Sequence, residues 1–149
     1  MVWRIENRRS TRSPAPDPGD FLSRIERERH GVSTTEAEAL RRSMGMSVEV
    51  YARLLGIKPA AYKLKRSRLG RFTGALGYAI GDLEDMLRKA EELVSPNASD
   101  FDLRRWFSGW IHCQQPALGG WAPVELLDTP AGRSMVTRVL GAMGSGVYL

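Results

Sequence analysis

The sequence predicts an all-α protein with a helix-turn-helix-like N-terminal domain and a smaller helical C-terminal domain. Apolar residues recur every three or four positions through most of the chain, and no stretch alternates apolar and polar residues over a convincing strand length. Capping residues stand where helices would begin, and glycines stand where they would end. The run Ser95-Pro96-Asn97 is the clearest internal boundary, and it separates the two parts.

Residues 1–19 contain three prolines and little apolar surface, which predicts a flexible basic arm. We expect residues 20–95 to form the first domain. Its predicted helices cover residues 21–30, the stretch from a capping box to about residue 44, residues 48–55, a stretch that starts at residue 59, and residues 74–94. The residues expected at the N-termini of these helices are Asp20, Ser33 or Thr35, Ser47 and Pro59. The side chains that we expect in the core are Ala37, Leu40, Met44, Val50, Tyr51, Leu54, Leu55, Leu76, Ile80, Leu83, Leu87 and Ala90.

Residues 96–149 predict the second domain. A helix capped by Ser99 or Asp100 should run toward Ile111, Gly119-Gly120 should turn the chain, and Pro123 should start a short helix. Thr129 and Pro130 predict the start of the last helix, which runs to about Met143. Its expected core positions are Val136, Val139, Leu140 and Met143. Among Trp106, Phe107, Trp110 and Trp121, we expect one to anchor the core and another to lie in an interface.

A helix-turn-helix pattern lies between Val48 and Ser67. Ala52 is the small residue that lets a second helix cross closely, and Gly56 supplies the positive φ that the turn needs. Leu55 and Ile57 flank the turn as core, and Tyr62 packs the second helix back onto the first. Two packed helices without any role in DNA binding would show a similar pattern, so charge has to distinguish the two interpretations.

Charge favours DNA. Residues 1–75 carry a balance of +8 and residues 76–149 a balance of −3, and the stretch 58–71 has six basic residues and no acid. The second helix would meet the major groove, and most of the affinity would come from phosphate contacts and depend on salt. The predicted DNA-binding residues are Lys58, Ala60, Lys63, Lys65, Arg66 and Arg68. Ala60 offers only apolar contact with a thymine methyl group. We expect binding to operator DNA as a homodimer.

The sequence offers few candidate catalytic residues, so we expect no enzymatic activity. His112 and Cys113 are neighbours that point in different directions, so they form a poor nucleophile and base. Helix capping explains Glu125 and Asp128 better than paired catalytic carboxylates do. The spacing of possible ligands predicts no metal, and no phosphate-binding loop or other cofactor motif is found. A lone cysteine and the lack of a long apolar run or a secretory signal predict a cytoplasmic protein with no membrane span.

From about Gly31 to the end, the sequence resembles the MbcA/ParS/Xre antitoxins. The motifs that carry this resemblance are Trp110, the Pro-Ala-Leu-Gly-Gly stretch 116–120, Pro123, the Glu-Leu-Leu run 125–127, Thr129, Gly132, Val136, Leu140 and the closing Gly-Val-Tyr 146–148. One departure lies in the second helix of the helix-turn-helix. Members often have Thr-Leu-x-Arg there, whereas this chain has Ala61-Tyr62-Lys63-Leu64.

The resemblance implies an antitoxin of a type II toxin–antitoxin system. Its partner would be a RES-type toxin that degrades NAD, or a related ADP-ribosyl-transferring toxin, whose active site the C-terminal end blocks. The complex would repress its own operon. The toxin-facing residues implied by position are Trp121, Arg133, Gly146, Val147, Tyr148 and Leu149. The small, uncharged tail suits a narrow pocket, and its terminal carboxylate could pair with toxin arginines. The alternative is a stand-alone helix-turn-helix transcriptional regulator whose C-terminal half serves dimerisation.

Overall fold

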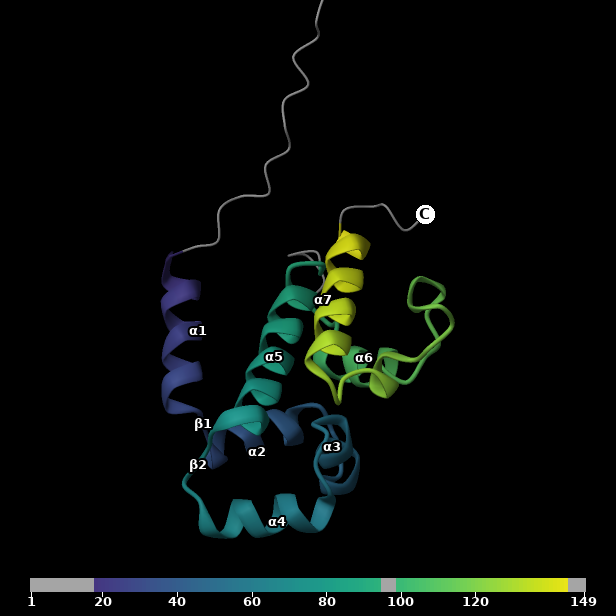
Figure 1. Ribbon diagram of the computed structural model, residues 1–149. Helices are drawn as coiled ribbons and strands as arrows, with labels where there is room; N and C mark the ends of the chain where they lie inside the picture. The colour runs from purple at the N-terminus through teal and green to yellow at the C-terminus, as the bar shows by residue number, and fades with distance from the viewer. Residues whose placement is uncertain (1–17, 95–98, 145–149) are drawn as a thin grey trace, which may run out of the picture.

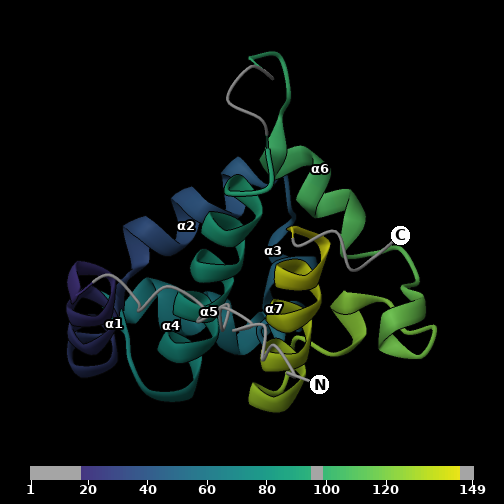
Figure 2. The same cartoon turned by 90° about the horizontal axis from the view of Figure 1, so that it is seen from above.

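A long central helix, α5 (Gly74–Glu91), organises the computed structural model, which describes residues 18–94 and 99–144. Helices α1 (Pro18–His30), α6 (Leu103–Trp110) and α7 (Pro130–Gly144) all contact α5, with α1 and α7 on opposite sides of it (Figures 1 and 2). The remaining elements are α2 (Thr34–Ser43), α3 (Val48–Leu54), α4 (Pro59–Arg68), two short 3₁₀ helices, η1 (Pro116–Leu118) and η2 (Pro123–Glu125), and the two-residue strands β1 (Val32–Ser33) and β2 (Arg71–Phe72). The predicted all-α class is confirmed.

The predicted helix caps form in most places. Ser33 Oγ accepts from the Glu36 backbone N–H at 3.1 Å, and Glu36 Oε2 accepts from the Ser33 N–H at the same distance, which completes a capping box for α2. Ser47 Oγ accepts from the Val50 N–H and caps α3. Two expected caps are wrong. Helix α1 begins at Pro18 rather than after Asp20, and Asp102 caps α6 instead of Ser99 or Asp100.

The short strands pair two connections that lie far apart in the sequence. Val32 faces Phe72 and Ser33 faces Arg71 in antiparallel register. Arg71 strengthens the junction by donating from Nε to the His30 carbonyl at 2.7 Å. Gly31 has φ of 74°, and a Cβ there would lie 2.2 Å from the Phe72 carbonyl oxygen, so only glycine fits. The strands therefore fix where α5 starts relative to α2.

The core is one cluster that includes residues from both predicted domains. The rings of Tyr51 and Tyr62 meet edge to face at 5.7 Å, and Phe72 lies 5.3 Å from Tyr62. Phe107, Ile111, Val136 and Leu140 fill the other end against α5, and all four are fully buried. Most of the predicted core positions are buried, and Leu76 and Met143 are partly buried against the cluster. The prediction that Val50 lies in the core is wrong, because its side chain is 37% exposed on α3.

Candidate DNA-facing and toxin-facing surfaces

Helices α3 and α4 have the two-helix geometry with a glycine turn that the sequence predicts. Ala52 is fully buried, Gly56 has φ of 75°, and the Ile57 N–H donates to the Ala52 carbonyl at 3.0 Å. Tyr62 is fully buried and anchors α4. Helix α4 lies along the outer edge of the molecule in Figure 1, so its far side is open to a partner.

The six predicted DNA-binding residues point in different directions. Lys58, Ala60, Lys63, Lys65 and Arg68 are exposed, whereas Arg66 is half-buried. Lys63 lies on the outward side and pairs with Glu49 on α3, with 2.8 Å between Nζ and Oε1. This contact lowers the pKa of Glu49, which keeps that carboxylate ionised. Lys65 instead lines a cavity between α4 and the start of α7, together with Gly56, Tyr78 and Asp128.

Arg66 belongs to a buried polar network around Glu38. The Glu38 side chain, on a residue 8% exposed, accepts from Arg41 at 2.8 Å, from the Tyr62 hydroxyl at 3.0 Å and from Arg66 at 3.3 Å. Burial by itself raises the pKa of Glu38, but the hydrogen bonds from these three partners outweigh it and leave the pKa lowered. Arg41 also donates to the Met46 carbonyl at 2.6 Å. Glu38 thus ties α2, the α2–α3 turn and α4 together.

The sequence alone does not reveal this network, since Glu38 suits a helix cap and Arg66 suits a DNA contact. A helical spacing of three between Glu38 and Arg41 and of four between Tyr62 and Arg66 could have indicated paired side chains on each helix. The contact between the two helices, however, is not encoded in any local pattern.

Local contacts hold the start of α7 and the η2 segment before it. The Thr129 hydroxyl oxygen accepts from the Gly132 N–H at 3.1 Å. A Cβ on Gly132 would lie 1.7 Å from the Leu126 carbonyl oxygen, so this crossing requires glycine. Glu125 Oε2 accepts from the Ala122 N–H at 2.8 Å, which agrees with a capping role for this carboxylate. These contacts account for the threonine and the glycine at this helix start.

Arg133, a predicted toxin-facing residue, is 6% exposed. Its Nε donates to Asp82 Oδ2 on α5 at 2.8 Å, and its Nη1 donates to the Leu127 carbonyl at 3.2 Å. In this chain the side chain therefore fastens α7 to α5. Whether it also touches a toxin stays a prediction.

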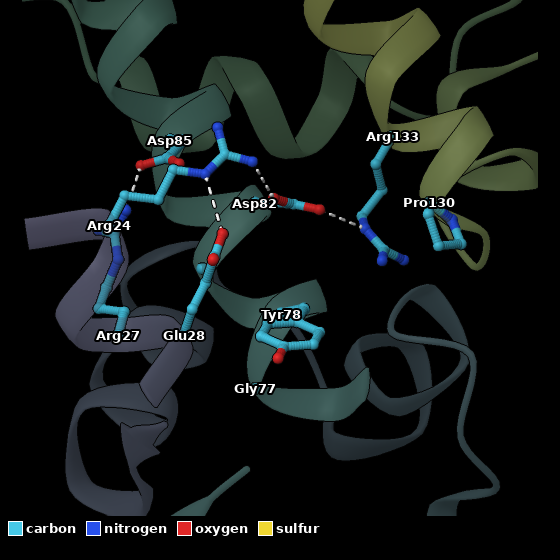
Figure 3. A pocket seen from close by; sticks show the side chains of 10 residues that line it. Arg24, Arg27, Glu28, Gly77, Tyr78, Asp82, Asp85, Pro130 and Arg133 are labelled. Carbon is cyan, nitrogen blue, oxygen red and sulfur yellow. Dashed lines mark hydrogen bonds and ion pairs between the residues drawn. The ribbon is translucent and has the colours of Figure 1, made fainter. Parts of the chain in front are cut away.

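A cavity of about 380 Å³ lies between α1, α5 and α7 (Figure 3). Each arginine that lines it faces an acid: Arg24 pairs with Glu28, Arg27 with Asp85, and Arg133 with Asp82. The charges are thus matched within the cavity, which gives it no preference for an anion or a cation. The ion pairs in its walls connect α1 and α7 to α5.

Trp121 has the strongest features of a binding residue among the predicted toxin contacts. Its side chain is 56% exposed, on the segment between α6 and α7 that projects from the body in Figures 1 and 2. The backbone of that segment is closed on itself: the Gln115 N–H donates to the Trp121 carbonyl at 3.1 Å and the Gly120 N–H to the Gln115 carbonyl at 3.0 Å. Leu118 is buried and anchors the segment. The exposed ring therefore sits on an ordered loop.

The other aromatic residues of this half serve mostly as core. Phe107 is fully buried and Trp110 is 8% exposed, while Trp106 stacks on Trp110 at 5.9 Å between ring centroids. The remaining predicted toxin contacts, Gly146, Val147, Tyr148 and Leu149, lie outside the described residues.

Within residues 18–94 and 99–144, no three His, Cys, Asp or Glu side chains come together as a metal site. In the same parts of the chain, no helix is both long and apolar enough to cross a bilayer.

Comparisons with known proteins show that the C-terminal part of the chain is similar to a class of toxin-binding domains. Residues 90–146 match the family described as the antitoxin Xre/MbcA/ParS C-terminal toxin-binding domain. A protein of Sphingobium sp. (strain YBL2) named "Prs ADP-ribosylating antitoxin" is 38% identical over 73 residues, which make up 49% of this chain and 43% of that relative. The chain thus spans less than half the length of this relative. The predicted resemblance to the Xre/MbcA/ParS antitoxins is thus confirmed for residues 90–146.

Proposed function

We propose that this chain is the antitoxin of a type II toxin–antitoxin system and acts without a catalytic step of its own. The observation that carries the proposal is the match of residues 90–146 to a domain described as toxin-binding. Trp121 supports it, because an exposed tryptophan on an ordered loop is the kind of side chain that dominates interface energies. Gly146, Val147, Tyr148 and Leu149 complete the proposed contact, and Arg133 holds the helix that leads to them.

The proposed partner is a toxin that consumes NAD, either a RES-type enzyme that degrades it or an ADP-ribosyl-transferring one. Both reactions break the bond between nicotinamide and ribose, so both toxins need a pocket for a dinucleotide diphosphate. The name of the Sphingobium relative includes ADP-ribosylation, which supports this class. In such a pocket, the small, uncharged segment 146–149 would take the place of the dinucleotide.

We further propose that the front half binds operator DNA as a homodimer and represses the operon. The outward face of α4, with Lys58, Ala60, Lys63 and Arg68, would meet the duplex. Arg66 is shared with Glu38 and Lys65 faces the cavity near Asp128, so both would contribute less than their charges suggest. The alternative, a stand-alone transcriptional regulator with a dimerising C-terminal half, shares this DNA surface and differs only in lacking a toxin.

Co-expression with the product of the adjacent gene tests the toxin proposal. We expect that product to arrest growth alone and to be harmless when this chain is present. Capture of the tagged full chain from its native cells should bring down the same product. If the neighbouring product is harmless alone and no NAD-consuming enzyme is captured, the chain is a stand-alone regulator.

A salt titration of DNA binding tests the front half. Replacing both Lys58 and Arg68 by Gln should reduce the slope of log affinity against log salt by about 1 for each phosphate that the variant no longer neutralises. The matched control replaces Arg105 and Arg138, which are exposed on α6 and α7, and removes the same charge. An equal reduction in both variants would place the DNA contact elsewhere.

A further inference from the structure

The outward face of α4 has an acidic partner that the sequence pattern conceals. Between Lys58 and Arg71 the sequence has no acid. Folding nevertheless brings Glu49 of α3 to within 2.8 Å of Lys63, and the two side chains are 52% and 49% exposed. The pair lies on the surface that we propose for DNA, so a phosphate group would meet both charges together.

The ion pair with Glu49 engages Lys63, so this basic residue of the α4 face is less available to contact a phosphate. Arg66 is occupied by Glu38, and Arg71 donates to the carbonyls of His30 and Gly31. Lys58 and Arg68 stand at the two ends of α4. Lys63 lies between them, so it is the cation through which the middle of α4 would reach the phosphate backbone.

We propose that Glu49 restrains DNA binding by holding Lys63, and so lowers the affinity of this chain for duplex DNA of arbitrary sequence. This inference rests on the proposed DNA-binding function. Non-specific affinity comes almost entirely from cations that neutralise phosphates and release counterions. A lysine already neutralised by a carboxylate releases no counterion until that carboxylate is displaced. Operator binding depends also on base contacts and shape, so it suffers less.

Glu49 also occupies the first turn of α3, where an acid favours the helix N-terminus. That role would affect stability and leave the salt dependence of DNA binding unchanged. The salt slope therefore separates a restraint on Lys63 from a contribution to the helix. Both side chains are about half exposed, so substitutions at these positions preserve the core.

The test is binding of the full chain to a mixed-sequence DNA duplex over about 50 to 200 mM salt. Glu49→Gln should bind more tightly at low salt and steepen the log–log slope by about 1 per bound chain, which adds about a 3.5-fold loss of affinity across that range. Glu91→Gln makes the same charge change on an exposed residue near the far end of α5 and should leave the slope unchanged.

The same substitution in a chain without Lys63 tests whether Glu49 acts through that lysine. In a Lys63→Gln chain, Glu49→Gln should no longer steepen the slope, because no cation is released. An unchanged slope in the single variant, or the same increase in the Lys63→Gln background, overturns the inference. If neither the natural chain nor Glu49→Gln binds the duplex, the DNA-binding proposal itself fails and the inference falls with it.

Discussion

Single side chains in this protein have roles that depend on what they face across the fold. Glu38, Arg66 and Arg133 are charged residues that a surface role would suit, yet each is held by partners from a different element. A buried charge is retained only when its partners satisfy it, because an unpaired one carries a large desolvation cost. Glu38 is the clearest case, because it accepts hydrogen bonds from α2 and α4 together.

Replacing Glu38 by Gln should lower the free energy of unfolding by about 1–3 kcal/mol at pH 7, because it weakens hydrogen bonds to Arg41, Tyr62 and Arg66. The pKa of Glu38 is lowered in the folded chain. Its contribution is therefore complete above the ordinary glutamate pKa of about 4.3 and is lost as pH falls through the lower, folded pKa. Urea denaturation between pH 7 and about 3 should show the gap between the two proteins narrowing. A gap that is constant with pH would contradict this account.

At the scale of elements, local hydrogen bonds decide most helix starts and ends. The Ser33 capping box, the Ser47 cap and the glycine turns at 31, 56 and 119 all involve atoms within a few residues, so the sequence predicts them. The start of α6 is different. Ser99, Asp100 and Asp102 can each cap a helix, and Asp102 does so in the register that buries Phe107 and Trp110.

Interactions between distant segments account for what the sequence could not predict. The strands β1 and β2 have two residues each, which is too short to leave an alternating pattern. Tyr51, Leu54 and Leu55 fill the buried side of α3 and leave Val50 outside. The sequence predicts the candidate DNA surface as a set of six residues, but their division among an outward face, a cavity and the Glu38 network follows only from tertiary packing.

Thr129→Ala tests the cap of α7. Removal of the hydroxyl leaves the Gly132 N–H without its acceptor and should cost about 1 kcal/mol of unfolding free energy. Thermal or urea denaturation measures the change. Ser134→Ala, at an exposed position on the same helix, should stay within about 0.5 kcal/mol of the natural chain. Equal effects at both positions would mean that the cap contributes nothing specific.

For the whole molecule, the architecture separates the two proposed binding surfaces. Helix α4 lies along one edge, and the segment with Trp121 projects from another (Figure 1). Central helix α5 contacts β1 near one end of the fold and packs along α7. This arrangement leaves room for DNA and a toxin to be bound by one chain at the same time.

Trp121→Ala should weaken toxin binding by roughly 30-fold or more while leaving stability nearly unchanged, since the ring is more exposed than buried. Isothermal titration with the captured toxin measures the change. Leu22→Ala removes a similarly exposed apolar side chain from α1, on the opposite side of α5 from α7, and should alter affinity little. A comparable weakening in the Leu22 variant would argue against a localised contact at Trp121.

The central claim is that the C-terminal end blocks the toxin active site from a domain that binds the toxin independently. The most direct measurement compares NAD consumption by the toxin in the presence of the full chain and of a chain ending at Gly144, which retains α7 and Trp121. The full chain should abolish NAD consumption, and the shortened chain should still bind the toxin but leave its activity largely intact. Complete inhibition by the shortened chain would contradict the account.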